Sequence, residues 1–255
     1  MDIYEKTKRF YERVNGEKRI IGKSFLGREI YAIRLGEGRP TGVAQYAIHG
    51  REWITAELAF KQYRRGLKSG SVWLIPLMNP DGALISYTGK DPLWKANGRR
   101  VDLNVNFDAD WGTGEKNVRT PASENYIGET PFSETETRVL RDFTLEIQPD
   151  FTISYHTKGE EIYWYYYQDE PTLRRDKEIA KALSASTGYP LKFAYGSAGG
   201  YKDWCIQKLK IPAFTVEVGK DGLKHPLGYG ALRDIMRKNG NALETLIEAV
   251  KRSKA

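Results

Sequence analysis

Residues 46–58, YAIHGREWITAEL, carry the change from a strand pattern to a helix pattern that indicates the fold class. A mostly apolar run ends at His49, and a helix-forming segment begins after Trp53. Three polar side chains of different chemistry, His49, Arg51 and Glu52, lie where a strand should give way to a helix. In α/β sheets, ligands bind at the carboxyl ends of the strands. The pattern therefore predicts a functional site at the end of this strand.

Strands and helices alternate along the rest of the chain, which predicts an α/β sheet covered by helices on both faces. We expect strands at 43–48, 71–78, 150–156, 161–167 and 213–218, with two more in 19–36 around the Leu26-Gly27 turn. We expect helices at 3–14, 55–67, 133–147, 171–186 and 230–252. Ser133 and Glu136 have the spacing of a capping box, and residues 79–82 (NPDG) form a strong turn signal. Because no linker or repeat interrupts the pattern, we expect one domain over residues 1–255.

Length and composition indicate a globular protein. The 255 residues contain no apolar run near the roughly 20 residues needed to span a bilayer, and the start has no signal-peptide pattern. We therefore expect a cytoplasmic protein that binds no membrane. The single cysteine, Cys205, excludes an internal disulfide and is expected to be a buried apolar residue. The net charge of +7 comes from dispersed lysines and arginines, which favours an acidic substrate over nucleic acid. The sequence sets no oligomeric state.

Two of the three histidines suggest a metal site. His49 and Glu52 are three residues apart at a strand end, so both side chains can turn toward one point. Catalytic zinc commonly takes three nitrogen or oxygen ligands and leaves one position open. His156, at the end of another predicted strand, is the candidate third ligand, although its distance along the chain leaves that open. His225, in LKHPLG, lies in no such motif and reads as a loop histidine.

The candidate residues lie within or near six short sequence motifs. They are HGREW, MNPDG, RRVDLNVNF, SYHTKGEEIYW, YGSAGGYKDW and FTVEVG. In this order they resemble the zinc carboxypeptidases of the carboxypeptidase A superfamily, over residues 22–228. The resemblance implies a single-domain α/β/α sandwich with a mixed, mostly parallel central sheet. It also implies a zinc metallopeptidase with one Zn²⁺ per chain.

The resemblance also implies roles for individual residues. It makes His49, Glu52 and His156 the zinc ligands, and Asp102 the carboxylate that orients the first histidine. Glu217 corresponds to the general base, which takes a proton from the attacking water and delivers it to the leaving amine. The alternative for Glu217 is an ion-paired carboxylate at a strand end.

Three further positions correspond to residues that contact substrate. Lys95 stands where carboxypeptidase A has an arginine that stabilises the oxyanion; the alternative is a solvated loop lysine. Tyr195 corresponds to the tyrosine that closes over substrate; the alternative is a packed loop aromatic. Asn104 corresponds to one of two residues that grip the terminal carboxylate of the substrate.

The second of those two residues is missing. Carboxypeptidases of the superfamily have an arginine where this chain has Val105, and a valine cannot bind a carboxylate. Arg99 or Arg100 could compensate, but both are better explained as surface charges. Ordinary carboxypeptidase specificity is therefore not expected.

The departures resemble a bacterial subgroup, the γ-D-glutamyl-L-diamino acid endopeptidases. This resemblance rests on three motifs, LWKANGRRVDLN, HTKGEEIYW and GYKDW. It implies cleavage of peptidoglycan stem peptides between γ-D-glutamate and diaminopimelate or lysine, with an anionic peptide or muropeptide as substrate. A metallocarboxypeptidase acting on ordinary peptides is the first alternative. A non-catalytic peptidoglycan-binding protein is the second, and the intact candidate site residues argue against it.

Overall fold

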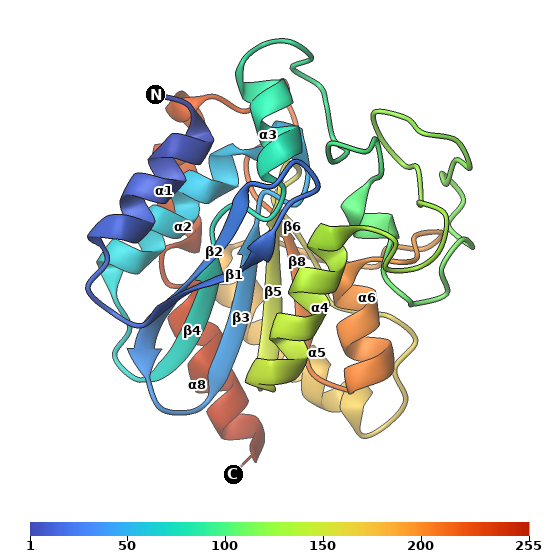
Figure 1. The fold of residues 1–255 in the computed structure, drawn as a ribbon. Helices are drawn as coiled ribbons and strands as arrows, with labels where there is room; N and C mark the ends of the chain where they lie inside the picture. The colour runs from blue at the N-terminus through green and yellow to red at the C-terminus, as the bar shows by residue number, and fades with distance from the viewer. Residues whose placement is uncertain (255) are drawn as a thin grey trace.

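The structure, a computed structural model, describes residues 1–254 and contains one eight-stranded sheet (Figure 1). The strands lie in the order β1-β2-β4-β3-β5-β8-β6-β7. Their bounds are β1 Lys18–Lys23, β2 Glu29–Glu37, β3 Thr41–Tyr46, β4 Gly70–Ile75, β5 Phe151–His156, β6 Glu161–Tyr163, β7 Leu191–Lys192 and β8 Ala213–Glu217. The sheet brings together segments that are far apart in the sequence.

The centre of the sheet is parallel and its edges are mixed. β4, β3, β5 and β8 run in the same direction, whereas β1 with β2, β2 with β4, and β6 with β8 pair antiparallel. The carboxyl ends of the four parallel strands therefore lie at one end of the molecule, and this is where ligands are expected to bind.

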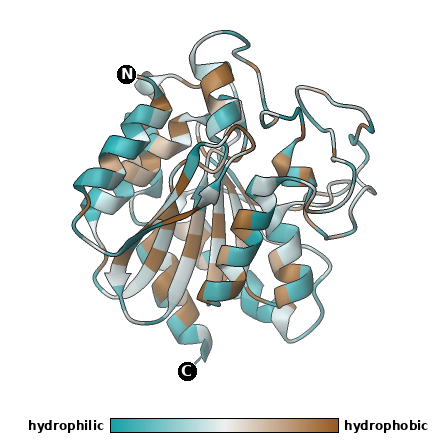
Figure 2. Cartoon of the chain, viewed as in Figure 1, coloured by the Kyte–Doolittle hydropathy of each residue, from teal (hydrophilic) through white to brown (hydrophobic). Residues whose placement is uncertain are grey.

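Helices cover both faces of the sheet, which confirms the predicted fold class (Figure 1). One buried cluster packs the sheet against α2, α5, α7 and α8; the other packs it against α4 and α6. The helices are α1 Ile3–Arg13, α2 Ile54–Arg65, α3 Pro80–Tyr87, α4 Thr135–Ile147, α5 Thr172–Thr187, α6 Tyr201–Trp204, α7 Leu232–Asn239 and α8 Ala242–Lys254. Figure 2 shows brown apolar bands on the strands between helices whose outer faces are teal. Within residues 1–254, no helix is both long and apolar enough to cross a membrane.

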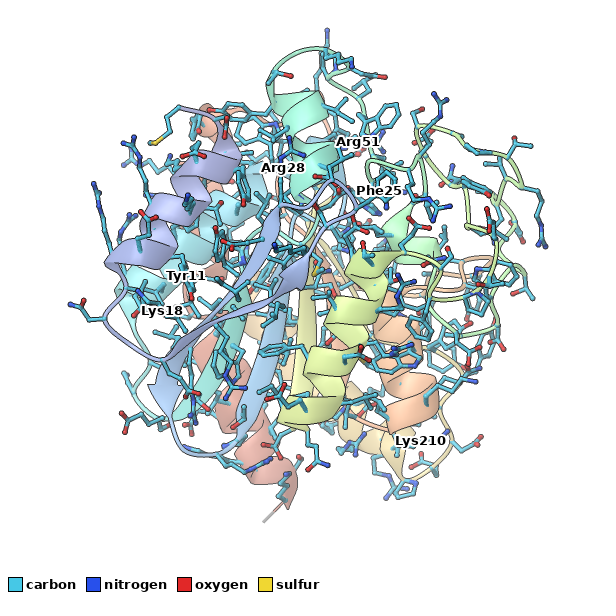
Figure 3. The ribbon with its side chains drawn as sticks, in the orientation of Figure 1. Tyr11, Lys18, Phe25, Arg28, Arg51 and Lys210 are labelled. Carbon is cyan, nitrogen blue, oxygen red and sulfur yellow. The ribbon has the colours of Figure 1, made fainter. Side chains whose placement is uncertain are left out.

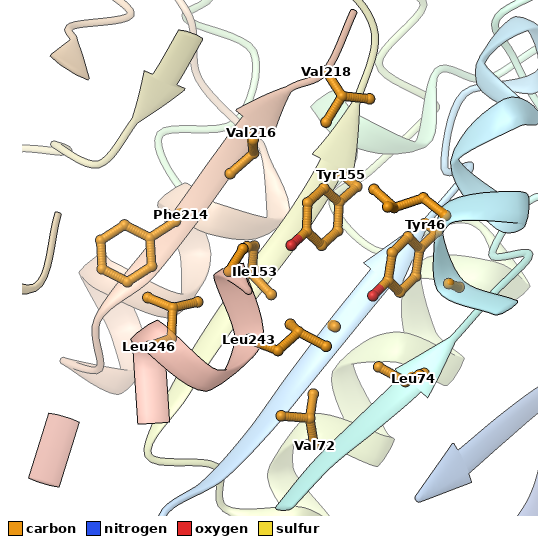
Figure 4. Close-up of a cluster of buried hydrophobic side chains, with 14 of the residues drawn as sticks. Tyr46, Val72, Leu74, Ile153, Tyr155, Phe214, Val216, Val218, Leu243 and Leu246 are labelled. Atoms are coloured by element: carbon orange, nitrogen blue, oxygen red, sulfur yellow. The ribbon is translucent and has the colours of Figure 1, made fainter. Parts of the chain in front are cut away.

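Aromatic rings at the centre of the sheet form the core beneath the strand ends. Tyr46 on β3 stacks on Tyr155 on β5, with ring centroids 4.9 Å apart (Figure 4). Both rings are fully buried, and the amide of Gln62 on α2 bonds to both hydroxyls. This packing fixes β3 and β5 side by side, and it therefore fixes the segments that follow each strand.

The capping box predicted from Ser133 and Glu136 is wrong. α4 begins after Glu134, and no side chain caps it. The Ser133 hydroxyl instead donates to the Glu134 carboxylate at 2.8 Å. The buried Glu136 accepts hydrogen bonds from the Phe25 backbone at 3.0 Å and the Asn97 amide at 3.2 Å. The Glu136 side chain is therefore engaged in contacts with residues distant in the sequence and does not cap the helix.

The predicted turn at residues 79–82 opens a helix. Asn79 caps α3 by accepting from the Gly82 backbone at 2.9 Å, and Pro80 is the first helical residue. The predicted helix 230–252 is two helices, α7 and α8, separated at Gly240 and Asn241. Glycine and asparagine have low helix propensity, which explains where the helix breaks.

The strand predicted at 161–167 ends at Tyr163. Trp164 packs into the cluster on one face of the sheet and Tyr166 into the cluster on the other. Residues two apart in a strand point to the same face, so this segment cannot continue as a strand. The two-residue strand β7 is not among the predicted strands.

Candidate metal and catalytic site

The site begins where β3 ends. After Tyr46 the chain turns through Ala47, which has φ of 51°, and residues Gly50–Glu52 form a short 3₁₀ turn. The Glu52 backbone donates to the His49 carbonyl at 3.1 Å, which closes this turn. The turn brings the two side chains together, with His49 Nδ1 2.9 Å from Glu52 Oε1. Arg51, between them in the sequence, lies at the same end of the molecule as α3 (Figure 3).

His156 reaches the same point from the neighbouring strand. It is the last residue of β5, which pairs with β3 in parallel. His156 Nδ1 lies 3.0 Å from Glu52 Oε2 and 3.1 Å from His49 Nδ1. All three side chains are buried. Sheet pairing thus joins residues that the sequence separates by about a hundred positions.

The arrangement suits a zinc ion. Ligands about 2.0–2.2 Å from a tetrahedral zinc lie roughly 3.3–3.6 Å from one another. The ligand atoms of His49, Glu52 and His156 lie within 4.8 Å of one another, and their closest separations, 2.9, 3.0 and 3.1 Å, are a few tenths of an ångström shorter than in such a site. Glu52 Oε2 is buried, and His156 Nδ1, although 3.0 Å away, does not lie in hydrogen-bond geometry with it. Two imidazole nitrogens and a carboxylate directed at one point form a donor set that zinc prefers.

Asp102 and Lys95 lie behind the first histidine. Asp102 Oδ1 is 3.2 Å from His49 Nε2, and Oδ2 is 3.0 Å from Lys95 Nζ. Asp102 is fully buried, which alone would raise its pKa, but Lys95 and His49 hold the pKa of this carboxyl well below its usual range. The ionised carboxylate can therefore fix the imidazole so that Nδ1 faces the other two candidate ligands.

Glu217 ends the next strand of the sheet. In the parallel pairing of β5 with β8, Glu217 is the register partner of His156. Its Oε2 atom is buried and has no hydrogen-bond partner within the described chain. Burial raises the pKa of Glu217 to about 7, against the opposing charge of His156. A carboxyl group with a pKa near neutrality can both accept and return a proton.

Two cavities adjoin these residues. One, of about 250 Å³, includes His49, Lys95 and Val105 in its wall. The other, of about 380 Å³, includes Glu217 in its wall. Asn104, Tyr195 and Ser197 line both cavities and therefore lie between them. Two larger hollows, of about 730 and 660 Å³, lie against α8, away from these side chains.

Two of the remaining candidates, Asn104 and Tyr195, line the cavities, and the two candidate arginines do not. Tyr195 is 73% exposed and stacks on Phe193, with centroids 5.7 Å apart, so it is not a packed loop residue. Asn104 accepts from the Tyr201 backbone at 3.2 Å. Arg99 and Arg100 are exposed and line neither cavity.

His225 lies closer to the site than its sequence context suggested. Its Nδ1 is 3.4 Å from the hydroxyl of Thr157, the residue that follows His156. Burial lowers the pKa of His225. Sequence reasoning also assigned no role to Lys202 and Asp203, which line the larger of the two adjoining cavities. The motif GYKDW could have indicated them in the sequence, since it places two opposite charges next to each other between aromatic residues.

Comparison with known proteins confirms the resemblance. The zinc carboxypeptidase family pattern matches residues 12–239. The chain is 30% identical to γ-D-glutamyl-L-diamino acid endopeptidase 1 of Lysinibacillus sphaericus over 78% of this chain and 59% of that protein. The chain thus spans about three fifths of the length of this relative.

Two solved structures show the same fold. Bovine thrombin-activatable fibrinolysis inhibitor, solved with a tick carboxypeptidase inhibitor, superposes with a TM-score of 0.84 at 22% identity over 99% of this chain and 97% of that chain. Murein-tripeptide amidase MpaA of Escherichia coli O157 superposes with a TM-score of 0.61 at 20% identity, over 97% and 96% of the two chains.

Proposed function

The chain belongs to the zinc carboxypeptidase family, and on that premise we propose that it is a zinc metallopeptidase that cleaves peptidoglycan stem peptides. The bond cleaved is that between γ-D-glutamate and the diamino acid that follows it. The similarity to a γ-D-glutamyl-L-diamino acid endopeptidase supports this choice within the family. The substrate is an anionic peptide or muropeptide.

We assign His49, Glu52 and His156 to the metal. Zinc, when bound, acts as a Lewis acid that activates water and polarises the scissile carbonyl. Asp102 holds His49 in the required tautomer through Nε2, and Lys95 balances the charge of Asp102. Because Lys95 also lines the cavity beside His49, its ammonium can donate to the oxygen that becomes negative as the carbonyl is attacked.

Glu217 is the proton carrier in this proposal. Its unpartnered Oε2 accepts a proton from the attacking water, and the same carboxyl group then gives that proton to the leaving amine. Tyr195, exposed on a loop between the two cavities, is placed to close over the bound substrate. Asn104, which lines both cavities, is placed to hold the substrate backbone.

The observation that carries the choice of substrate is Val105. Its side chain is partly exposed and belongs to the wall of the cavity that holds His49 and Lys95. An arginine here would place a guanidinium in that cavity and bind a terminal carboxylate in bidentate fashion. Valine leaves the cavity without that charge, so a chain that continues beyond the cleaved bond is accommodated better than a free C-terminus.

Mass spectrometry of a muropeptide mixture tests the proposal. Incubation with zinc-loaded protein should split tetrapeptide stems between glutamate and the diamino acid, and the Glu217→Gln variant should leave them intact. Release of only C-terminal residues would identify a carboxypeptidase instead. Muropeptide binding without any cleavage, at full zinc occupancy, would identify a non-catalytic binding protein.

A further inference from the structure

The two candidate zinc histidines differ in what lies behind them. His49 Nε2 has Asp102 Oδ1 at 3.2 Å, whereas His156 Nε2 is buried and has no hydrogen-bond partner among residues 1–254. His156 lines neither of the two cavities beside the site, so a substrate in those cavities does not supply a partner. A histidine that binds a metal through one ring nitrogen donates the N–H of the other to a carboxylate, a backbone carbonyl or a water molecule. The described chain places neither of the first two at His156 Nε2.

Two polar side chains lie next to His156 on the same face of the sheet. Ser154 and His156 are two residues apart on β5, and Gln45 on β3 is the register partner of Ser154. Successive residues of a strand point to opposite faces. All three side chains therefore project away from the face on which Tyr46 and Tyr155 stack (Figure 4). Gln45 and Ser154 thus form a pair directly before the strand ends that carry the candidate metal site.

The protein satisfies neither of these two side chains. Gln45 is fully buried and Ser154 is 1% exposed. Both Oε1 and Nε2 of Gln45, and the hydroxyl of Ser154, have no hydrogen-bond partner within the described chain. Burying a polar group without a partner is destabilising, and an internal water typically satisfies about two to four such groups at once. With His156 Nε2, three neighbouring side chains on one face present the groups that hold such a water.

A third polar residue connects this pair to solvent. Thr215 on β8 is the register partner of Ser154, is partly exposed, and lines the cavity beside Glu217. The row of polar side chains therefore runs from that cavity into the sheet, and water can enter along it. Much of the surrounding face is an apolar core, which includes Val43, Trp73, Ile75 and Ala213. An apolar residue at position 45 would avoid burying an unpartnered amide, so glutamine at this position indicates a ligand.

We propose that Gln45 and Ser154 hold an ordered water molecule that accepts the Nε2–H of His156 and thereby fixes the tautomer and orientation of this candidate ligand. The water does for His156 what the carboxylate of Asp102 does for His49. With the proton kept on Nε2, the lone pair of Nδ1 faces Glu52 Oε2 at 3.0 Å and His49 Nδ1 at 3.1 Å. Gln45 and Ser154 are positioning residues, because they act on the metal only through His156.

A crystal structure of the zinc-loaded protein tests the water site directly. We expect a water molecule about 2.7–3.2 Å from His156 Nε2 and from the Ser154 hydroxyl or the Gln45 amide. A direct hydrogen bond from Nε2 to a carbonyl or carboxylate of the protein would overturn the inference. This inference rests on the proposed assignment of His156 to the metal and is independent of the substrate.

Zinc affinity measures what the water contributes. Ser154→Ala and Gln45→Met each remove groups that hold the water. Competition with a chromogenic chelator should show a zinc dissociation constant about 10- to 100-fold higher than in the parent, the usual effect of removing a partner of a metal ligand. Ser154→Thr, which keeps the hydroxyl, should retain most of the parent affinity. Thr152→Val is the matched control: it removes a buried hydroxyl from the same face of β5, two residues farther from His156, and should bind zinc as the parent does.

The ring proton of His156 separates this role from a general loss of stability. In the zinc-loaded parent, the Nε2–H proton should give an NMR signal that exchanges slowly with solvent, and the nitrogen shifts should identify Nδ1 as the metal-binding atom. In Ser154→Ala the same proton should shift or exchange faster, while the metal-free protein melts near the parent temperature. A lower melting temperature with an unchanged proton signal would show a purely structural role and overturn the inference. If Gln45→Met does not fold, Ser154→Ala and the parent crystal structure still decide.

The outcomes separate the two proposals. Equal zinc affinity in the parent, Ser154→Ala and Gln45→Met overturns the role of the water and leaves the proposed function standing. A parent that binds no zinc, or a His156→Ala variant that keeps the full parent affinity, overturns the proposed metal site and, with it, this inference.

Discussion

Glu217 is the residue on which turnover depends most directly in this account. Glu217→Gln keeps the size of the side chain but removes its capacity to accept a proton. We expect turnover to fall by about 10²–10⁴-fold, the usual contribution of a general base. Zinc content should stay at one per chain, because His49, Glu52 and His156 are unchanged. Activity on a γ-glutamyl–diaminopimelyl peptide together with elemental analysis measures both; an active, zinc-loaded variant would move the base to another residue.

The raised pKa of Glu217 also predicts how stability depends on pH. In the metal-free protein this carboxyl has a pKa of about 7, against 4.5 for an ordinary glutamate. Between these values the folded state binds more protons than the unfolded state, so the contribution of Glu217 to stability falls as pH rises. Chelated Glu217→Gln protein should therefore gain stability relative to chelated parent from pH 4.5 to 7, reaching roughly 1–3 kcal/mol. Urea unfolding at several pH values measures this; a difference that does not change with pH would contradict it.

Val105 sets the substrate in this account, and its partly exposed position makes a larger side chain tolerable. Val105→Arg places a guanidinium in the cavity beside Lys95 and Asn104. Hydrolysis of a hippuryl dipeptide with a free C-terminus should rise by roughly 10- to 100-fold, the range for a hydrogen bond to a charged group. Cleavage of a stem tetrapeptide should fall, because the new side chain occupies space that the continuing peptide uses. Val105→Leu, which adds bulk without charge, should not create the hippuryl activity; if it does, charge is not the determinant.

Site residues whose contacts are with residues close in the sequence could be predicted from the sequence, and those whose contacts depend on strand order could be predicted only in part. His49 and Glu52 are close in sequence, and one turn brings them together. His156 and Glu217 could be placed at strand ends, but only the strand order shows that they are register neighbours. Lys202 and Asp203 could not be placed at this cavity from the sequence, because the cavity wall is built from four separate segments.

At the scale of elements, the turn after β3 is held by close backbone approaches that require glycine. A Cβ atom on Gly50 would lie 2.4 Å from the Gly82 carbonyl oxygen and 2.8 Å from that of Trp94. A Cβ on Gly82, in α3, would lie 2.1 Å from the Ala96 carbonyl oxygen. The turn, α3 and the loop that carries Lys95 therefore pack backbone to backbone behind the candidate metal site. This packing gives the glycines of HGREW and NPDG a physical reason.

Gly50→Ala should damage both the fold and the site. Backbone atoms cannot move aside cheaply, so we expect a loss of roughly 1–3 kcal/mol in the free energy of unfolding. Zinc affinity should fall as well, since His49 and Glu52 flank the displaced residue. Gly230→Ala is the matched control, because a Cβ there meets nothing within 4 Å. Denaturant unfolding and zinc titration of both variants measure the effects, and a Gly50→Ala protein equal to the control would show that the turn has room to adjust.

Most elements could be predicted from the sequence, and the errors have physical causes. Strands β3, β4, β5 and β8 are apolar runs that need no tertiary information. The capping box failed because Glu136 contacts Phe25 and Asn97, which are distant in the sequence. The strand at 161–167 was predicted too long because its aromatic residues pack on two faces of the sheet rather than one.

At the scale of the whole molecule, the parallel centre of the sheet creates the site. β3, β5 and β8 lie side by side, so three segments that leave the same end of the sheet carry His49, His156 and Glu217. The segments between α3 and α4 and between β7 and α6 supply Asp102, Lys95 and Tyr195 around them. The sheet therefore fixes the metal and the base, and the loops are free to change the substrate. Val105 lies in the first of these segments.

The central claim is that the protein cleaves a γ-D-glutamyl–diamino acid bond and does not remove C-terminal residues. The most direct test is a pair of kcat/KM values for the zinc-loaded protein, one for an N-acetylated γ-D-glutamyl–diaminopimelyl tetrapeptide and one for a hippuryl dipeptide with a free C-terminus. We expect the first value to exceed the second by at least about 10-fold, since no guanidinium at position 105 binds a terminal carboxylate. A higher value for the hippuryl dipeptide would contradict the account and identify an ordinary metallocarboxypeptidase.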